Sequence, residues 1–228
     1  MQKIGLIGQF RYPCSIERYY LRALKQLGHR VVLDADNIIS GAQKVDLTIV
    51  VKWFDHPEML PHPRVLVFPD LISRFKKYYD SVEKYYDYIF LEHKESVINN
   101  KRIFYLDFGY CPQEHYFIDG LPKDIACLFI GTCHPNREFL KKIPEITRYG
   151  NEWGDTKDVY GGEYRNLCSR AKIIINHHYP GDTTNMRDYE APNFKAMIIT
   201  DKTPFKIFKD CMIYSDELDL REKIRYYH

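Results

Sequence analysis

The sequence predicts an α/β protein built from two Rossmann-like domains that face each other across a cleft. Three observations carry this prediction: near-continuously apolar runs of strand length, helix-forming segments between them, and a second half that opens like the first. Apolar runs of this kind are typical of parallel strands buried on both faces. Their alternation with helices favours parallel α/β sheets.

Composition agrees with two small globular domains. The 228 residues are 45% hydrophobic and 28% charged, and the formal net charge is only +2. Interspersed charges argue against a dedicated electrostatic nucleic-acid binder. The apolar runs are far shorter than the roughly 20 residues of a membrane span, and the N-terminus becomes strand-like without a leader pattern. We therefore expect a cytoplasmic protein.

The cysteines predict neither a zinc knuckle nor a redox motif, because no Cys-x-x-Cys pair is present. We expect reduced thiols at Cys14, Cys111, Cys127, Cys133, Cys168 and Cys211.

The first domain is expected to span residues 1–110. Its strands are predicted at KIGLIG, RVVLDA, LTIVVKW, RVLVFPD, YDYIFLEH and RIFYLDFG. A helix after the first strand is indicated by apolar residues at helical spacing from Ile16 to Leu27, with Ser15 as N-cap and Gly28 as the stop. A second helix is expected over residues 72–86. Its segment interleaves lysines with tyrosines, which favours an amphipathic helix with tyrosines toward the sheet, or else an acceptor surface.

A linker is expected over residues 111–123, where two prolines and a glycine lack a clear period. The second domain, residues 124–228, restarts with the strand IACLFIGTC and a helix and short strand in PNREFLKKIPEITRYG. Further elements are predicted as a helix over 164–170, a strand in AKIIINHHY, a helix over 185–194, strands in MIIT and CMIYS, and a helix over 216–228.

Ligand-binding residues are expected after strands, because open α/β sheets bind ligands at the carboxyl ends of their strands. Gly131 and Thr132 end one such strand, and Asn136 and Arg137 begin the next helix, where backbone N–H groups and the guanidinium suit a phosphate. A plain turn with a surface arginine is the alternative. Tyr160 and Gly161 suit a base or sugar ring, although such residues also mark turns.

The stretch from residue 175 to 190 is dense in polar residues after a buried strand, which is a site signal. Its loop carries His177, His178, Asp182, Thr183 and Thr184. Adjacent histidines point to opposite sides of an extended chain, so a site without a metal is favoured over a metal site. Arg187 and Glu190 share one helical face, so a cation suited to phosphate and a carboxylate suited to sugar hydroxyls could meet one ligand.

From residue 102 onward the chain resembles GT-B glycosyltransferases of the spore-maturation (CgeB-like) group, which is related to the group 1 transferases. The matching segments are YLDFGYCPQEHY, FIGTCHPNREFL, VYGG, AKIIINHHYPGDTTNMRDYEAPNFKAMIITD and MIYSDELDLREKIRYY, in the order of that family.

The resemblance implies a compact GT-B transferase that takes a nucleotide sugar as co-substrate, without a metal or other cofactor, and passes the sugar to an acceptor held by the first domain. It implies that Glu190 binds the donor ribose, Arg187 and Arg137 the diphosphate, with Gly131 and Thr132 near phosphate. Tyr160 and Gly161 would line the base, and Asn185 belongs to the same donor cluster.

Two departures from the family pattern stand out. Lys195 occupies the position five residues after the acidic residue where the family usually has glycine, so either the turn is made differently or the lysine serves the donor. The chain also stops at His228, where relatives continue. A catalytically silent nucleotide-binding module is therefore an alternative.

The acceptor is not identified by the sequence, and glycans, small molecules and hydroxymethylated bases in DNA all remain open. For a catalytic base the candidates are Asp70, at a strand end in VFPD, then Glu17 in the first loop, and His93. Asp34 and Asp36 form the Asp-x-Asp pattern of metal-dependent GT-A transferases, but such a pair more often caps a turn.

Overall fold

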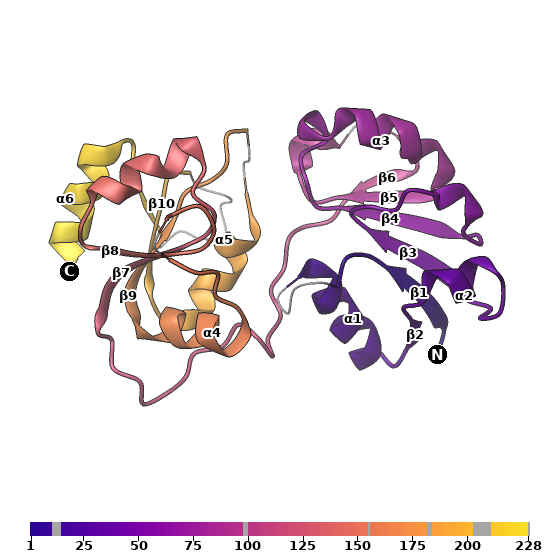
Figure 1. Cartoon of the computed structure of the whole chain (residues 1–228), viewed down its shortest axis with the longest axis horizontal. Helices are drawn as coiled ribbons and strands as arrows, with labels where there is room; N and C mark the ends of the chain where they lie inside the picture. The colour runs from indigo at the N-terminus through magenta and orange to yellow at the C-terminus, as the bar shows by residue number, and fades with distance from the viewer. Residues whose placement is uncertain (11–14, 98–99, 155, 182–183, 203–210, 228) are drawn as a thin grey trace. The chain divides into compact units, whose positions relative to one another are not determined.

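The computed structural model describes the chain except residues 11–14, 98–99, 155, 182–183, 203–210 and 228 (Figure 1). The chain forms two compact units, Met1–Phe108 and Gly109–His228. Each unit contains one parallel sheet, which confirms the predicted fold class of two Rossmann-like α/β domains. The cleft and the boundaries of the linker stay predictions.

The first unit alternates strands and helices as its apolar runs predict. Its strands are β1 (Lys3–Ile7), β2 (Arg30–Val32), β3 (Leu47–Val51), β4 (Arg64–Phe68), β5 (Tyr88–Leu91) and β6 (Ile103–Tyr105). Its α-helices are α1 (Ile16–Gln26), α2 (Ala35–Ile39) and α3 (Lys76–Val82), and its 3₁₀ helices are η1 (Pro57–Met59), η2 (Ile72–Arg74), η3 (Glu83–Tyr85) and η4 (Lys94–Ser96).

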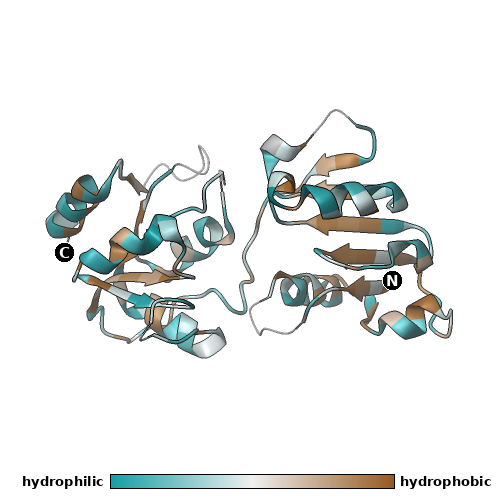
Figure 2. Cartoon of the chain, turned by 45° about the horizontal axis from the view of Figure 1, so that its top comes forward, coloured by the Kyte–Doolittle hydropathy of each residue, from teal (hydrophilic) through white to brown (hydrophobic). Residues whose placement is uncertain are grey.

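Apolar side chains on both faces of the first sheet explain its layers. Helices α2 and α3 pack on one face in a cluster that includes Ile38 and Val82, and α1 packs on the other through Leu21 and Leu24. In Figure 2 the strands are mostly brown (hydrophobic), whereas the helices include many teal (hydrophilic) residues. Hydrophobic strands are expected where parallel strands are buried on both faces. Helix α1 has Ser15 at its N-cap position, and Gly28 beyond its end has a φ of +82°.

The tyrosine-rich segment forms three short helices, η2, α3 and η3, in place of the single helix predicted over residues 72–86. Tyr79 and Tyr86 are buried in the core, whereas Lys76 and Lys77 are exposed. This arrangement favours the amphipathic reading of the segment. The predicted turn-capping role of Asp34 is also observed, because its carboxylate accepts from the Asn37 N–H at 3.1 Å and begins α2.

The described residues of the second unit form the strands β7 (Ile125–Ile130), β8 (Ile146–Tyr149), β9 (Ala171–Asn176), β10 (Met197–Thr200) and β11 (Met212–Ile213). Its α-helices are α4 (Gly161–Arg170), α5 (Met186–Glu190) and α6 (Glu217–Tyr227), and its 3₁₀ helices are η5 (Pro135–Lys142) and η6 (Ala191–Phe194). The helix predicted after β7 is therefore 3₁₀, and the one predicted over 185–194 divides at Ala191, next to Pro192.

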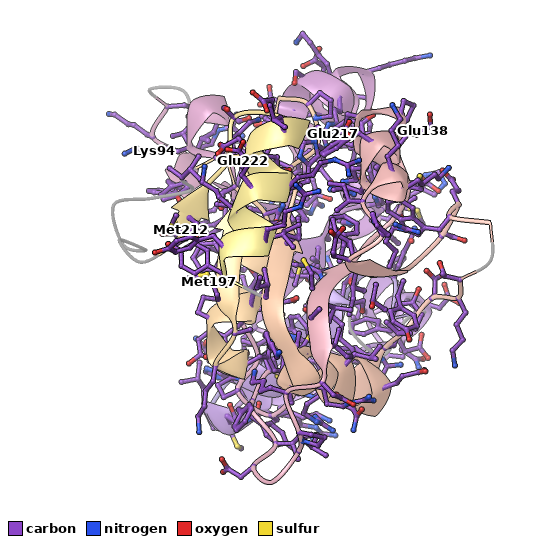
Figure 3. All side chains as sticks on the ribbon, turned by 90° about the vertical axis from the view of Figure 1, so that its left-hand side faces the viewer. Lys94, Glu138, Met197, Met212, Glu217 and Glu222 are labelled. Atoms are coloured by element: carbon purple, nitrogen blue, oxygen red, sulfur yellow. The ribbon has the colours of Figure 1, made fainter. Side chains whose placement is uncertain are left out.

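Helices also cover both faces of the second sheet. Leu140 of η5 and Leu220 and Ile224 of α6 pack on one face, and α4 and η6 pack on the other through Leu167 and Phe194. Figure 3 shows α6 lying along its face of the sheet, with Met197 and Met212 beside it.

The two sheets share one strand order. The first runs β2-β1-β3-β4-β5-β6 and the second, read from its other edge, β8-β7-β9-β10-β11, and every described pairing is parallel. In each unit the chain changes direction across the sheet between its first and third strands. Such switch points, at the carboxyl ends of β1 and β3 and of β7 and β9, are where open α/β sheets bind ligands.

No helix in the described part of the chain is both long and apolar enough to cross a membrane. Cys127, Cys133 and Cys168 are buried free thiols, and Cys14 lies outside the described residues.

Candidate functional site

Arg137 lies at the switch point of the second sheet and is bound to main-chain carbonyls. Its Nε and Nη2 donate to the His177 carbonyl at 3.0 and 2.6 Å, and its Nη1 donates to the Thr132 carbonyl at 3.1 Å. The guanidinium also lies over the ring of Phe129, 5.4 Å from its centroid. Arg137 thus fastens the loop after β7 to the end of β9. Its role in binding a diphosphate stays a prediction.

The loops after β7 and β8 approach each other at two glycines. A Cβ atom on Gly150 would lie 2.4 Å from the carbonyl oxygen of Gly131, so only glycine fits there without a shift of the backbone. The same carbonyl accepts a hydrogen bond from Trp153 Nε1 at 2.6 Å. The predicted phosphate-binding residues Gly131 and Thr132 are therefore held in a tightly packed loop at the switch point.

His178 is the centre of a buried ionic group at the ends of β9 and β10. Its Nε2 is 2.9 Å from Asp188 Oδ2, and its Nδ1 is 2.6 Å from Asp201 Oδ1. Burial lowers the pKa of His178, but the hydrogen bonds and charges of the two carboxylates outweigh it and raise the pKa to about 9. The side chain is therefore an imidazolium between two carboxylates at neutral pH.

Asp188 extends this group to the start of α5. Its carboxylate accepts from the N–H of Asn185 at 2.9 Å and from Asn176 Nδ2 at 2.5 Å. Asn185 is the N-cap of α5, and its side chain accepts from the Arg187 N–H at 2.9 Å. Asn185 and Asp188 also form a capping box, in which the side chain of each accepts from the backbone N–H of the other. Together, Asn176, His178, Asn185, Asp188 and Asp201 form what we call the His178 network, which fixes α5 to the sheet.

Asn176, Asp188 and Asp201 were not predicted as site residues. Asn176 ends β9 and Asp201 directly follows β10, so each stands at a strand end, where polar residues are a site signal. Asp188 stands three residues after Asn185, the spacing of a capping box. These positions carried the signal that could have identified them.

The two adjacent histidines differ in environment. His177 shares a hydrogen bond with the hydroxyl of Tyr214, and burial lowers its pKa, with Asp201 opposing. Among the described residues, no group of three or more His, Cys, Asp or Glu side chains is placed to hold a metal ion. Asp182 and Thr183, expected in the same loop, lie outside the described residues.

Tyr164 of α4 contacts both Arg187 and Glu190. Its hydroxyl donates to Glu190 Oε2 at 2.9 Å, and the Arg187 guanidinium lies over its ring, 5.4 Å from the centroid. Burial raises the pKa of Tyr164 well above its usual value, so the hydroxyl stays a donor. The predicted pairing of these two side chains on one side of α5 is therefore a feature of the structure, whereas Tyr164 was missed.

The second oxygen of Glu190 is approached by a histidine from the segment that precedes β7. His115 Nε2 lies 3.4 Å from Glu190 Oε1. Its Nδ1 accepts from the Cys111 N–H at 3.0 Å, so the proton of the neutral ring is on Nε2, directed at the carboxylate. Tyr160 and Gly161 begin α4, one helix turn from Tyr164, where Gly161 has a φ of +54°.

Lys195 adopts a left-handed backbone conformation, with φ 52° and ψ 36°, directly after η6. Glycine adopts this conformation at little cost, and other residues rarely do. The Lys195 ammonium lies 3.3 Å from Asp119 Oδ1 and over the ring of Phe117. The chain thus makes with lysine a turn that suits glycine.

The three residues predicted as catalytic all lie in the first unit. Asp70 follows β4 and its carboxylate is 3.6 Å from the Lys52 ammonium. Glu17 is buried in the first turn of α1, so close to β1 that a Cβ on Gly8 would lie 2.5 Å from its Cγ. His93 is buried beside the end of β5 and its ring packs edge-on against Phe108. The structure does not test their catalytic role.

Glu92, which directly follows β5, was not predicted as a site residue. The side chain is buried, and Oε1 accepts from the Tyr20 hydroxyl at 2.8 Å. Burial raises the pKa of Glu92 to about 8, against the opposing hydrogen bond from Tyr20. A charged residue directly after an apolar strand was the available signal.

Comparison with known proteins finds one matching family model and several solved structures of similar fold. Residues 134–228 match the model of a family described as glycosyl transferase-like. A solved structure of HepE from Anabaena in complex with UDP-glucose is similar over 99% of this chain and 89% of that chain, with a TM-score of 0.67 and 9% identity.

A second structure of HepE, with UDP and glucose, gives a TM-score of 0.63 at the same identity and coverage. A glycosyltransferase from Rickettsia africae is similar over 98% of this chain and 87% of that one, with a TM-score of 0.55 and 12% identity. At these identities the likeness concerns the fold. No curated protein matches the sequence.

Proposed function

We propose that the chain is a GT-B glycosyltransferase of the spore-maturation (CgeB-like) type, which moves a sugar from a nucleotide-sugar donor to a hydroxyl acceptor without a metal ion. The observation that carries this proposal is the meeting of Arg187 and Glu190 at Tyr164, on a helix fixed to the sheet by the His178 network. The match of residues 134–228 to a glycosyl transferase-like family supports it.

In this proposal Arg187 binds the donor diphosphate and Glu190 accepts from the ribose hydroxyls. A carboxylate accepts about four hydrogen bonds, so ribose hydroxyls can join Tyr164 and His115 on Glu190. Arg137 contributes less to the diphosphate than Arg187, because its guanidinium donates to the carbonyls of His177 and Thr132.

The remaining donor contacts follow the order of the loops. Gly131 and Thr132 approach phosphate at the switch point, Tyr160 and Gly161 line the base, and Asn185 holds the start of α5. A uridine nucleotide is the first candidate for the donor, because HepE, a protein of similar fold, has been solved in complex with UDP-glucose.

Calorimetry with a panel of nucleotide sugars and nucleoside diphosphates tests the donor site. We expect Arg187→Ala and Glu190→Gln each to weaken binding about 10-fold or more, because each removes charge-assisted hydrogen bonds of about 1.5–3 kcal/mol. Glu222→Gln, on the exposed part of α6, is the control and should bind as wild type. The proposal fails if the wild-type chain binds no member of the panel.

Two further measurements test the metal independence and the turnover of the donor. Binding that survives a chelator supports a metal-independent donor site. Release of nucleoside diphosphate from the donor distinguishes a transferase from a silent nucleotide-binding module, which would bind without turnover.

A further inference from the structure

The segment that precedes β7 lies along α4, and both belong to the second unit. Arg165 Nη1 donates to the Gln113 carbonyl at 3.3 Å. One helical turn further along α4, Ser169 Oγ accepts from the Ile118 N–H at 3.0 Å. The two contacts hold the segment on both sides of His115, so the position of this histidine is fixed by the helix.

His115 occupies a core position with its polar edge toward Glu190. Its ring packs edge-on against Tyr164 and Phe194, and its side chain is only 2% exposed. Because Nδ1 accepts from the Cys111 N–H at 3.0 Å, the proton of the neutral ring is on Nε2, which lies 3.4 Å from Glu190 Oε1. His115 is thus too deeply buried to bind a ligand itself, and it acts on the carboxylate.

A donor group stands at each oxygen of the Glu190 carboxylate. The Tyr164 hydroxyl donates to Oε2 at 2.9 Å, and His115 Nε2 faces Oε1. The Glu190 side chain keeps 9% of its surface exposed, more than that of His115. A carboxylate oxygen accepts about two hydrogen bonds, so a ligand hydroxyl can join at each oxygen. Donors on both oxygens oppose rotation of the carboxylate and so determine where these hydroxyls must lie.

We propose that His115 is a positioning residue for ribose recognition, which together with Tyr164 holds the Glu190 carboxylate so that each oxygen meets one of two adjacent hydroxyls. The inference rests on the donor site proposed above, in which Glu190 accepts from the ribose. The 2′- and 3′-hydroxyls of a ribose are neighbours and match the two oxygens of one carboxylate. A site built to bind such hydroxyls rejects a sugar that lacks them, so His115 contributes to the selection of ribonucleotides.

The test compares the affinity of the full chain for a nucleoside diphosphate and for its 2′,3′-dideoxy form, by calorimetry with the UDP, GDP, ADP and CDP pairs. For the base that binds, the wild-type chain should bind the ribose form about 10-fold or more tightly. The ratio of the two dissociation constants is the readout, because a loss of folded protein affects both ligands alike. A purely structural His115 would leave this ratio unchanged when it is replaced.

Two amide variants separate the roles of the two ring nitrogens. His115→Gln can place an N–H donor near the position of Nε2 and should keep at least about half of the wild-type ratio. His115→Asn can keep an acceptor for the Cys111 N–H but cannot reach Glu190, and should lower the ratio to about 3-fold or less.

Two further variants control for packing and stability. His115→Phe keeps an aromatic ring against Tyr164 and Phe194 but has no donor, so it should lower the ratio as His115→Asn does, also where the asparagine variant does not fold. Ile224→Val alters the core on the other face of the second sheet, and should keep the wild-type ratio although it lowers stability.

The outcomes distinguish this inference from the proposed function. A wild-type ratio in His115→Asn or His115→Phe, or a ratio lost in His115→Gln as well, overturns the inference and leaves the donor site intact. Equal affinity of the wild-type chain for the ribose and dideoxy forms overturns it together with the ribose contact of Glu190. Absence of binding by every nucleotide refutes the proposed donor site itself.

Discussion

At the scale of single residues, Lys195 stands where the family pattern has glycine, and its side chain contacts Asp119 and Phe117. The sequence identified the position but left open how the turn is made. A backbone angle depends on the whole turn. Residue type alone therefore could not decide whether the turn is made differently or the lysine serves the donor. The left-handed conformation answers the question about the turn and does not test a contact with the donor.

Replacement of Lys195 measures how much the left-handed conformation lowers the free energy of unfolding. Lys195→Gly and Lys195→Ala both remove the ammonium contacts, but only glycine relieves the left-handed backbone. We expect the glycine variant to be more stable than the alanine variant by about 1 kcal/mol, measured as the free energy of unfolding in urea. Equal stabilities would mean that the left-handed turn is absent in solution.

Gly150 gives a second prediction at this scale. Its φ is +123°, and an added Cβ would press on the Gly131 carbonyl, so Gly150→Ala should lower the free energy of unfolding by about 2 kcal/mol or more. Gly154→Ala is the control, because Gly154 also has a positive φ but open space around its Cβ. Thermal or urea unfolding of both variants compares them, and a similar loss in each would exclude the steric explanation.

At the scale of elements, strands were predicted better than helices. A buried parallel strand is marked by its own apolar residues, and each predicted strand corresponds to an observed one. Helix limits depend on the first turn and on local breaks. Gly161 and Gly162 disfavour a helix by propensity, yet they form the first turn of α4. The His178 network escaped prediction because its members meet only when β9, β10 and α5 are packed together.

The network predicts a pH dependence of stability. The pKa of His178 is raised from 6.5 to about 9 in the folded chain, so the folded state holds this proton more tightly than the unfolded state does. The resulting stabilisation is complete below pH 6.5 and is lost as the pH rises through about 9, a loss of about 3 kcal/mol.

Urea unfolding at pH 6.5 and pH 9 measures this loss. In His178→Gln the decline between the two pH values should be smaller than in wild type by about 3 kcal/mol. The exposed His56 provides the control, and His56→Gln should keep the wild-type decline. An unchanged decline in His178→Gln would show that the histidine is not charged in the fold.

At the scale of the whole molecule, the two-domain α/β class was predicted from periodicity alone, because two sets of apolar strands alternate with helices along the chain. The donor residues were predicted from strand ends and helical spacing, and the family resemblance assigned a role to each. Glu92 and the supporting role of Tyr164 came only from the structure, since burial and the distance between segments far apart in sequence cannot be read from local patterns.

The two units predict a localised response to the donor. Hydrogen exchange with and without a saturating nucleoside diphosphate should slow the amides of β7, β9, α4 and α5 about tenfold or more, because a ligand stabilises the segments that it contacts. Amides of β1, β3 and β4 should change by less than about 2-fold under the same conditions. Protection confined to the first unit would show that the nucleotide binds there, and would contradict a donor site in the second unit.

The shared strand order also bears on how the chain is assembled during synthesis. In each unit the third, fourth and fifth strands add successively to one growing edge, and only the second strand pairs on the other side. Every strand after the first of its unit therefore pairs with one that has already left the ribosome. All strands of the first sheet can pair before β7 is translated. Each unit can therefore fold by itself, in the N-to-C order in which domains generally fold.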